Sequence, residues 1–504
     1  MPESRESLQQ HLRRRLRKHQ FVVVSNREPY QHVYRDGRIT WRQPASGVTV
    51  ALDPVMRASR GLWVAAASGD ADAAVTDRNG LVAVPPDRPA YQLKRLWLSK
   101  EQEKHYYDGF ANSAIWPLCH VAYRRPVFRL EDWEAYRQVN ELFADQVARE
   151  VRDQPAFIFI QDYHFALLPR LLRARCPRAV VAQFWHIPWP NPEVFRICPW
   201  KQEILHGILG NDLLGFHLQY DCDNFTETVG RELESRPDHE TNSIVRGGHS
   251  TRIRAFPISV DFDDLTRRAA SAEVRRLMAG FRRRYRIPEN AVLGVGVDRL
   301  DYTKGIPERL AGFERLLERY PQYRGRVVLF QVAPPSRIQV EEYRRLGEEV
   351  DQRVSGINWR YGTRDWQPVI YLREPVPLPG LLALYRLARF LVVTSLHDGM
   401  NLVAKEFVAA QVDANGVLVL SQFTGAARQM KDALIVNPFL PDAIAERMRE
   451  AIEMDPVAVR RRMGRLRAQV RERNVYHWAS EILKKLHKLV GEHERTAAPV
   501  RRVA

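Results

Sequence analysis

The chain has 504 residues, of which 45% are hydrophobic and 27% are charged, and its formal net charge is +17. This length excludes a single small binding module, and the apolar content excludes global disorder. The best apolar run, residues 381–395, is interrupted by Arg386 and Arg389 and falls short of the roughly 20 residues of a membrane span. We therefore expect two large folded domains and no membrane partner.

The basic balance is compatible with nucleic acid, anionic surfaces or phosphorylated small molecules as partners. Much of the arginine lies in segments of helical pattern, such as residues 282–286 and 460–463, which favours solvated helix faces. No helix-turn-helix, RRM or zinc signature is present, so nucleic acid is the least favoured partner. The first 18 residues lack the apolar core of a secretory signal and the four cysteines lack ligand spacing, so we expect a cytoplasmic protein without structural zinc.

Short apolar and β-branched runs, each followed by a segment of helical period, recur along the chain. These predicted strands are residues 21–25, 156–160, 179–185, 291–297, 326–332, 390–394 and 416–421. Runs that are apolar on both faces are typical of parallel strands covered by helices. The alternation predicts an α/β protein, and the number of runs favours two sheets rather than one.

A boundary between the two sheets is predicted near residues 256–262. Before it, residues 242–254 predict a hairpin around Gly247 and Gly248, and after it a long charged helix opens a second strand–helix series. We expect a mobile basic arm, two lobes that face one cleft, and a C-terminal helix with a mobile tail. The bounds of these four parts are residues 1–20, 21–257, 258–475 and 476–504.

Ligands of open parallel sheets sit at the carboxyl ends of the strands, so the residues after each strand are candidates for chemistry. Arg27 follows the first strand, and a small-residue turn ending in Gly47 precedes a predicted helix, a combination that could hold an anion. Asp162 and His164 follow the second strand, and His186 follows the third. Each of these residues alone is equally compatible with a surface, capping or core role.

The second series opens with the segment 294–305, which carries two cations at a strand end. A dinucleotide fingerprint would need a glycine in place of Arg299, and no Walker pattern is present. Arg299 and Lys304 could instead receive a diphosphate and stabilise it as it departs. The alternative is that Asp298 and Asp301 simply pair with these cations.

Two later strand ends also carry polar residues. Arg337 follows one of them, and the densest polar segment, residues 395–406, follows the other. We expect Asp398 to cap a helix whose first amides, those of residues 399–401, bind a sugar hydroxyl or a phosphate oxygen. Glu406 lies about two turns further on near the same face, where it could accept hydrogen bonds from a ribose diol.

Taken together, these segments resemble the retaining, metal-independent glycosyltransferases of the trehalose-6-phosphate synthase group. The resemblance extends from about residue 21 to about residue 475 and rests on the blocks VVVSNR, IWPLCH, QDYHFALLPRLLR, HIPWPNPEVFR, LLGFH, VDRLDYTKGIPERL, QVAPPSR, DGMNLVAKEFVAAQ and GVLVLSQFTGAA. It implies the GT-B architecture of two Rossmann-like lobes. It also implies transfer of glucose from UDP-glucose, or another NDP-glucose, to glucose 6-phosphate without a metal or other cofactor.

The resemblance assigns roles to individual residues by position. The catalytic residues are Arg299, Lys304, His186 and Asp398. The donor-binding residues are Gly47, Arg299, Lys304, Asp398, Gly399, Met400, Asn401, Leu402 and Glu406. The acceptor-binding residues are Arg27, Tyr107, Trp116, Asp162 and Arg337. In such enzymes the departing phosphate oxygen accepts the proton of the attacking hydroxyl on the same face, so the anomeric configuration is retained without a carboxylate nucleophile.

The sequence departs from the family pattern mainly in the predicted acceptor lobe. The usual Gly-Gly is Ser46–Gly47, the usual Trp-Ser-Gly is replaced by residues 65–69, and residues 28–41 form a longer stretch. The missing aromatic leaves open another phosphorylated acceptor, such as glycerol 3-phosphate. A catalytically silent sugar-phosphate sensor is a further alternative, although the retained cations count against it. The sequence also leaves a homo-oligomer open.

Overall fold

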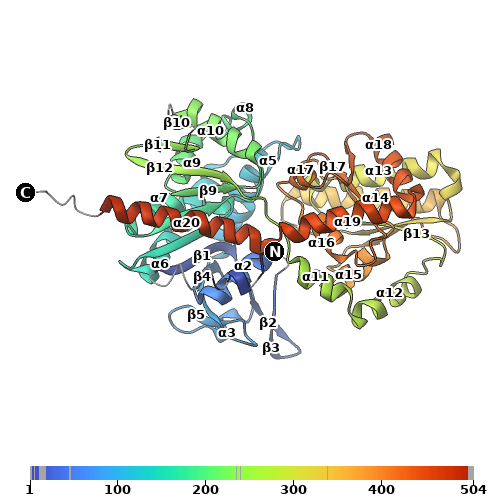
Figure 1. Ribbon diagram of the computed structural model, residues 1–504, viewed down its shortest axis with the longest axis horizontal. Helices are drawn as coiled ribbons and strands as arrows, with labels where there is room; N and C mark the ends of the chain where they lie inside the picture. Colours follow the sequence, from blue (N-terminus) through green and yellow to red (C-terminus); the bar gives the residue numbers. More distant parts are fainter. Residues whose placement is uncertain are drawn as a thin grey trace, which may run out of the picture. The chain divides into compact units, whose positions relative to one another are not determined.

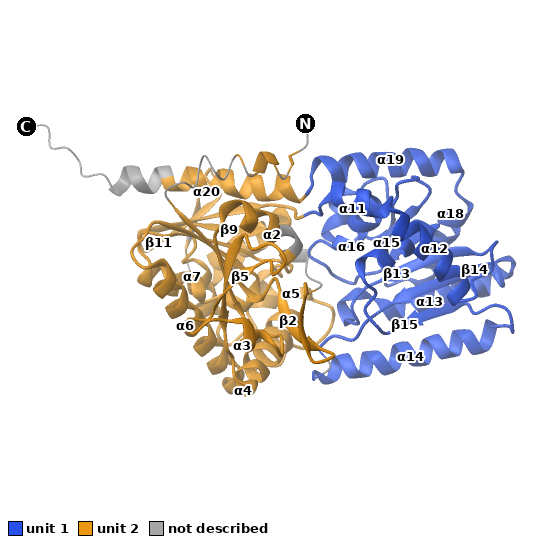
Figure 2. Cartoon of the chain, turned by 90° about the horizontal axis from the view of Figure 1, so that it is seen from below, with its two compact units in different colours: residues 1–2, 259–474 blue, residues 3–258, 475–504 orange. Residues whose placement is uncertain are grey.

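The computed structural model describes residues 3–4, 6–8, 10, 19–44, 47–233, 235–238, 240–337 and 339–497, and it divides into two compact units. Unit 1 is formed by Ser259–Asn474, and unit 2 by Glu3–Ile258 together with the C-terminal helix α20 (Val475–Ala497), as Figure 2 shows. Helix α20 belongs to unit 2 because it packs on the helix α2 (Gly47–Ser59) and on the strand β8 (Val180–Phe184) of that unit. Its buried Trp478 lies edge-on to Phe184, with ring centroids 5.3 Å apart.

The described part of unit 2 contains a ten-stranded sheet (Figure 1). In spatial order its strands are β10 (Arg236–Asp238), β11 (Ser243–Arg246), β12 (His249–Ala255), β9 (Leu213–Phe216), β8 (Val180–Phe184), β7 (Ala156–Gln161), β1 (Gln20–Arg27), β4 (Leu62–Ala66), β6 (Tyr91–Leu96) and β5 (Leu81–Val84). The strands from β12 to β6 pair in parallel, and antiparallel strands flank them at both edges. A separate hairpin is made by β2 (Gln31–Arg35) and β3 (Arg38–Arg42).

The described part of unit 1 contains a six-stranded sheet in which every neighbouring pair is parallel. Its strands in spatial order are β15 (Val369–Leu372), β14 (Val327–Val332), β13 (Val292–Val297), β16 (Phe390–Val393), β17 (Val417–Ser421) and β18 (Leu434–Val436). Strand β14 is buried at every residue, which requires cover on both of its faces. Because all neighbouring strands are parallel, the carboxyl ends of the six strands lie at one edge of the sheet.

The helices alternate with these strands along the chain. In unit 2 they are α2 (Gly47–Ser59), α3 (Asp72–Val75), α4 (Lys100–Gln102), the π-helix η1 (Glu103–Ile115), α5 (Trp116–His120), α6 (Leu130–Val151), the 3₁₀ turn η2 (Tyr163–Phe165), α7 (Leu168–Arg175), α8 (Pro192–Phe195), α9 (Lys201–Ile208), α10 (Gln219–Leu233) and α20. In unit 1 they are α11 (Phe262–Ala269), α12 (Ala272–Arg284), η3 (Tyr302–Lys304), α13 (Ile306–Arg319), η4 (Pro321–Tyr323), α14 (Glu341–Tyr361), α15 (Leu378–Leu387), α16 (Leu402–Ala410), α17 (Gly425–Gln429), α18 (Pro441–Glu453) and α19 (Pro456–Glu472). None of the helices in the described ranges is both long enough and apolar enough to span a membrane.

The structure confirms all seven predicted strands, which are β1, β7, β8, β13, β14, β16 and β17, and the hairpin of β11 and β12. The single long helix predicted after Asp261 is wrong, because the chain forms two helices there, α11 and α12. The Ser271 side chain accepts a hydrogen bond from the Val274 amide and so starts a new helix. The predicted strands are buried, so local apolar pattern was enough to find them, whereas this break depends on one capping side chain.

The predicted mobile arm and tail fall largely on residues 11–18 and 498–504, which lie outside the described residues. Nearer the start of the chain, Glu3 accepts a hydrogen bond from Ser480 Oγ at 3.2 Å, and Leu8 is fully buried. The described residues at the beginning of the chain therefore contact α20. All four cysteines are buried free thiols, as expected for core residues.

Candidate functional site

The predicted donor residues of unit 1 lie in the loops that follow the adjacent strands β13 and β16. The Leu396 amide donates to the Thr303 carbonyl at 2.7 Å, and Thr394 Oγ1 donates to the Gly305 carbonyl at 2.7 Å. Gly305 has φ +61° and lies so close that a Cβ atom there would be 2.1 Å from the Thr394 carbonyl oxygen. Only glycine allows this approach, which brings the segment carrying Lys304 against the second loop.

Lys304 and Asp398 form an ion pair in which Lys304 Nζ donates to Asp398 Oδ2 at 2.6 Å. The same carboxylate oxygen accepts from Asn401 Nδ2 at 3.0 Å and from Ser395 Oγ at 3.3 Å. Both members of the ion pair are largely buried, so solvent screens the interaction only weakly. The structure thus brings two predicted catalytic residues together.

The expectation that Asp398 caps helix α16 is wrong, because Asn401 occupies the cap. Asn401 has φ +72°, and its side-chain oxygen accepts from the Ala404 amide at 3.0 Å. Asp398 instead pairs through its backbone with the loop before α17, where its carbonyl accepts from the Gly425 amide at 3.0 Å. The residues from Gly399 to Asn401 are therefore a loop leading into the helix, which begins at Leu402, rather than its first turn.

Arg299 is a half-buried cation that forms no ion pair or hydrogen bond with the residues that the structure describes. The alternative in which the neighbouring aspartates form its direct ion pairs is also wrong. Asp298 pairs with Arg309 at 2.5 Å, and Asp301 pairs with Arg337 at 3.2 Å. The site therefore keeps one positive charge available at the end of β13.

Arg337 and Glu406 are each held by a tyrosine. The Arg337 side chain is 4% exposed, pairs with Asp301 and lies over the Tyr343 ring at 5.4 Å. Burial disfavours ionisation of Asp301, but the charges of Arg337, Arg299 and Lys304 hold its pKa below the ordinary value. Glu406 Oε2 accepts from the Tyr385 hydroxyl at 3.2 Å, and burial raises the pKa of Glu406.

The predicted acceptor residues of unit 2 gather around the end of β1. Arg27 Nη2 donates to the Tyr107 hydroxyl at 2.9 Å, and the Tyr107 ring stacks on His164 at 5.7 Å. The Trp116 ring lies 5.8 Å from Tyr163, the residue before His164. Tyr107 comes from the π-helix η1, and π-helical segments are frequent at functional sites. The structure therefore brings Arg27, Tyr107 and Trp116 into one connected cluster.

The Asp162 side chain binds the backbone amide of His186 at the ends of the neighbouring strands β7 and β8. Asp162 has the unusual φ of +75°, and its Oδ1 accepts from the amides of Tyr163 at 3.0 Å and His186 at 3.1 Å. Burial, reinforced by His217 and His164, lowers the pKa of His186 well below its ordinary value. His186 is therefore a neutral imidazole at neutral pH.

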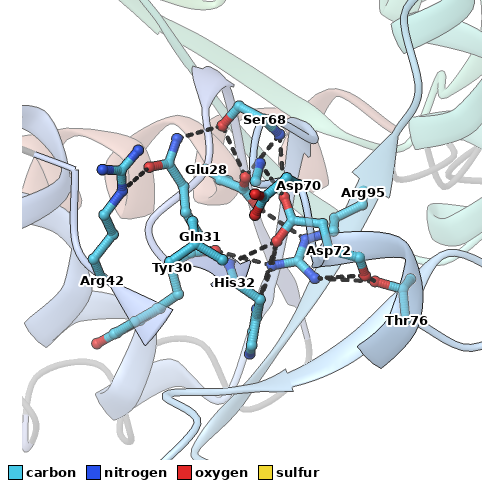
Figure 3. Close-up of polar contacts among 12 residues, drawn as sticks. Glu28, Tyr30, Gln31, His32, Arg42, Ser68, Asp70, Asp72, Thr76 and Arg95 are labelled. Atoms are coloured by element: carbon cyan, nitrogen blue, oxygen red, sulfur yellow. Dashed lines mark hydrogen bonds and ion pairs between the residues drawn. The ribbon is translucent and has the colours of Figure 1, made fainter. Parts of the chain in front are cut away.

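A buried ionic cluster next to Arg27 was not predicted from the sequence. Figure 3 shows Arg95 between the carboxylates of Glu28 and Asp72, each at 2.8 Å, with the Arg95 guanidinium also reaching His32 Nδ1 at 2.9 Å. Burial, and a hydrogen bond that the protonated Glu28 donates to Asp72, raise the pKa of Glu28 to about 7. The sequence contained no clear signal for this cluster, because the strand that carries Arg95 also contains Gln92 and Lys94 and does not mark Arg95 as buried.

The altered segment of the acceptor lobe belongs to this cluster. Ser68 donates to Glu28 Oε1 through both its amide and its hydroxyl, each at 2.9 Å, and the Gly69 amide donates to Asp72 Oδ2 at 2.6 Å. Gly47 is the first residue of α2, whereas Ser46 lies outside the described residues. Within the described ranges, no group of three or more His, Cys, Asp or Glu side chains could hold a metal ion.

A model of glycosyltransferase family 20 matches residues 19–488. The trehalose-6-phosphate synthase of Mycobacterium marinum is 38% identical over 472 residues, which cover 92% of this chain and 93% of that protein. A solved trehalose-6-phosphate structure from E. coli, bound with UDP-2-fluoro glucose, is 32% identical with a TM-score of 0.82, covering 93% of this chain and 99% of that chain. A UDP-forming α,α-trehalose-phosphate synthase from Burkholderia xenovorans, in complex with glucose-6-phosphate, is 30% identical with the same TM-score and coverages. These similarities confirm the expected α/β fold of the GT-B class.

Proposed function

This chain belongs to glycosyltransferase family 20, and from that premise we propose that it transfers glucose from UDP-glucose to glucose 6-phosphate, giving α,α-trehalose 6-phosphate. The observation that carries the proposal is the cation pair at the carboxyl end of β13. Lys304 is already compensated by Asp398, whereas Arg299 retains its charge for an incoming anion. Such a site suits a leaving group that gains negative charge in the transition state.

The donor half of the reaction is proposed for unit 1. Arg299 and Lys304 hold the diphosphate, and Glu406 accepts hydrogen bonds from the ribose. The loop amides from Gly399 to Leu402 add further donors to the phosphate oxygens, and Asp398 contacts the transferred glucose. As the bond to the anomeric carbon breaks, the two cations stabilise the departing UDP, whose phosphate oxygen accepts the proton of the attacking hydroxyl on the same face.

The acceptor half is proposed for the cluster in unit 2, and Arg337, which lies in unit 1, is a further candidate for the acceptor phosphate. Arg27 binds the phosphate of the acceptor sugar, and its hydrogen bond to Tyr107 fixes the direction in which the guanidinium points. Trp116 and Asp162 contact the sugar ring, and His186 contacts the glucose that is transferred. Binding of the phosphate by Arg337 requires this residue to exchange its present partner, Asp301, for the ligand.

A different phosphorylated acceptor is the second candidate, because of the segment Ala65–Gly69. It lacks the aromatic residue that the family usually has there, and its Ser68 and Gly69 amides are already used by buried carboxylates. Glycerol 3-phosphate, a smaller acceptor, would give glucosylglycerol phosphate. A sugar-phosphate sensor without catalysis is less consistent with a charge kept for the leaving group.

The deciding experiment incubates the protein with UDP-, GDP- or ADP-glucose and either glucose 6-phosphate or glycerol 3-phosphate. We expect UDP release that depends on glucose 6-phosphate, with an α,α-linked product by NMR. Turnover of glycerol 3-phosphate alone would refute the trehalose assignment, and no turnover with any pair would favour the sensor. Both substrates are water-soluble metabolites, so we also propose that the enzyme is cytoplasmic. We further propose that it needs no metal, because Arg299 and Lys304 supply the positive charge for the diphosphate, and this predicts full activity in EDTA.

A further inference from the structure

Gln161, the last residue of β7, contacts the imidazole of His186 although nothing in the proposed function uses it. Gln161 Oε1 lies 3.0 Å from His186 Nε2, and Gln161 Nε2 donates to the Ile160 carbonyl at 3.2 Å. Gln161 is 1% exposed. A carbonyl oxygen can only accept, so the amide nitrogen of Gln161 must face Ile160 and its oxygen must face the imidazole.

This orientation decides which nitrogen of His186 carries the proton. An amide oxygen requires a donor, so His186 Nε2 must be protonated, and in a neutral imidazole Nδ1 is then an acceptor. Among the described residues, the hydrogen bond of the His186 ring is the one that Nε2 forms with Gln161. The only lone pair of this ring that a ligand can use is therefore the one on Nδ1.

The rest of the residue is fixed from several sides. The His186 amide donates to Asp162 Oδ1 at 3.1 Å, and the His186 carbonyl accepts from His217 Nε2 at 3.1 Å. The ring packs against Phe184 at 4.5 Å and against His217 at 5.6 Å. With the backbone and the ring both held, the hydrogen bond to Gln161 selects the tautomer rather than merely following it.

We propose that Gln161 is a positioning residue that fixes His186 as a hydrogen-bond acceptor, through Nδ1, for one hydroxyl group of the transferred sugar. The inference rests on the proposed function, in which His186 contacts the glucose. The titratable groups around the ring are His164, His217 and Asp162. None of them donates to Nδ1 among the described residues, so the sugar hydroxyl is the donor that completes the arrangement.

The tautomer can be measured without turnover, by ¹⁵N NMR of the histidine-labelled full-length protein, with the His186 signals identified by their loss in His186→Gln. We expect protonated Nε2 and unprotonated Nδ1 in the wild-type protein between pH 6.5 and 8. Gln161→Met keeps the side-chain length but removes the acceptor, and it should give a mixture of tautomers. A wild-type protein with the proton on Nδ1 would overturn the proposal.

Activity tests whether the fixed tautomer serves the sugar, using two variants of nearly equal size. Gln161→Met should lower kcat/KM for the nucleotide sugar about tenfold, which is the scale for weakening one hydrogen bond, here the one between His186 Nδ1 and the sugar hydroxyl. Gln161→Glu places a carboxylate at Nε2, which favours the imidazolium and converts Nδ1 into a donor. The acid limb of its kcat profile should therefore move up by at least one pH unit, a shift that Gln161→Met should not show.

A series of donors that each lack one glucose hydroxyl completes the test. The penalty of Gln161→Met should disappear for one member of the series and persist for the others. A uniform penalty, or equal pH profiles for both variants, would reduce Gln161 to a structural residue. A wild-type protein that turns over no nucleotide sugar would instead refute the proposed function, while the NMR measurement would still decide the tautomer.

Discussion

The two candidate half-sites differ in how many of their charged residues lie within one short segment of sequence. In unit 1, Arg299 and Lys304 belong to one short loop, and Asp398 belongs to the loop after the adjacent strand. In unit 2, Arg27 reaches Tyr107 across 80 positions of sequence. Both half-sites depend on tertiary assembly, since Lys304 reaches Asp398 across 94 positions, but in unit 1 two cations of the site already lie together in one short segment.

Each unit also contains a buried ionisable group whose pKa is shifted by burial, an acid in unit 2 and a base in unit 1. Unit 2 buries Glu28 beside Asp72 and Arg95, and unit 1 buries Lys405, whose Nζ donates to Gln429 Oε1 at 2.8 Å. Burial disfavours the charged form in both cases, so it raises the pKa of the acid and lowers that of the base. Each unit therefore offers one variant that tests the site and one that tests the buried charge.

The largest effect is expected for the cations of unit 1. Arg299→Ala and Lys304→Ala should each lower kcat about a hundredfold or more, the scale for losing one partner of the transition-state charge. Steady-state UDP release measures this loss. Arg460→Ala, on the exposed side of α19, removes the same charge elsewhere and should leave kcat unchanged. Wild-type turnover in both site variants would show that neither Arg299 nor Lys304 stabilises the departing UDP.

In unit 2 we expect a loss of acceptor binding rather than of chemistry. Arg27→Ala should raise the KM for glucose 6-phosphate about 10- to 100-fold, because the phosphate loses the positively charged guanidinium that donates hydrogen bonds to it. Tyr107→Phe removes only the hydroxyl that orients Arg27 and should have a smaller effect in the same direction. Slow donor hydrolysis without acceptor should stay at the wild-type rate in both variants. A fall in that hydrolysis would place Arg27 on the donor instead.

The buried amine of unit 1 should make stability rise with pH. Burial, with a contribution from Arg473, lowers the pKa of Lys405 from 10.5 to about 7, so between these values the folded state binds fewer protons than the unfolded chain. Lys405→Met should reduce the gain in Tm between pH 7 and 9.5 by about 2–4 °C relative to wild type. Calorimetry of Lys100→Met, an exposed control, should show the wild-type gain.

The buried acid of unit 2 should make stability fall as pH rises, and this effect should be smaller than that of Lys405. The pKa of Glu28 is raised from 4.5 to about 7, so its contribution to stability is present at pH 4.5 and is lost as pH rises towards 7. Glu28→Gln mimics the protonated form, and its Tm should exceed that of the wild type by about 1–3 °C at pH 8 but not at pH 5. Glu342→Gln, an exposed control, should follow the wild type at both values. A variant less stable than the wild type at pH 8 would mean that the fold stabilises the Glu28 carboxylate and does not raise its pKa.

The amino-acid sequence by itself determined the α/β class, the seven buried strands and the cations at the end of β13. These features depend on local pattern, because an apolar run on both faces makes a covered parallel strand and a polar residue after it lies at the ligand-binding edge. Family resemblance then supplied the roles. The sequence could not show that Asn401, rather than Asp398, caps α16, since both residue types are good caps and only the ion pair to Lys304 separates them.

Only the tertiary structure decided which side chains meet. The partners Glu28 and Arg95 lie 67 positions apart, and Gln161 reaches His186 from a neighbouring strand. Such contacts depend on strand order and on the registers of parallel pairs, which local pattern does not encode. The proton on His186 and the charge on Glu28 are consequences of burial and of those partners, so they became readable only once the chain was folded.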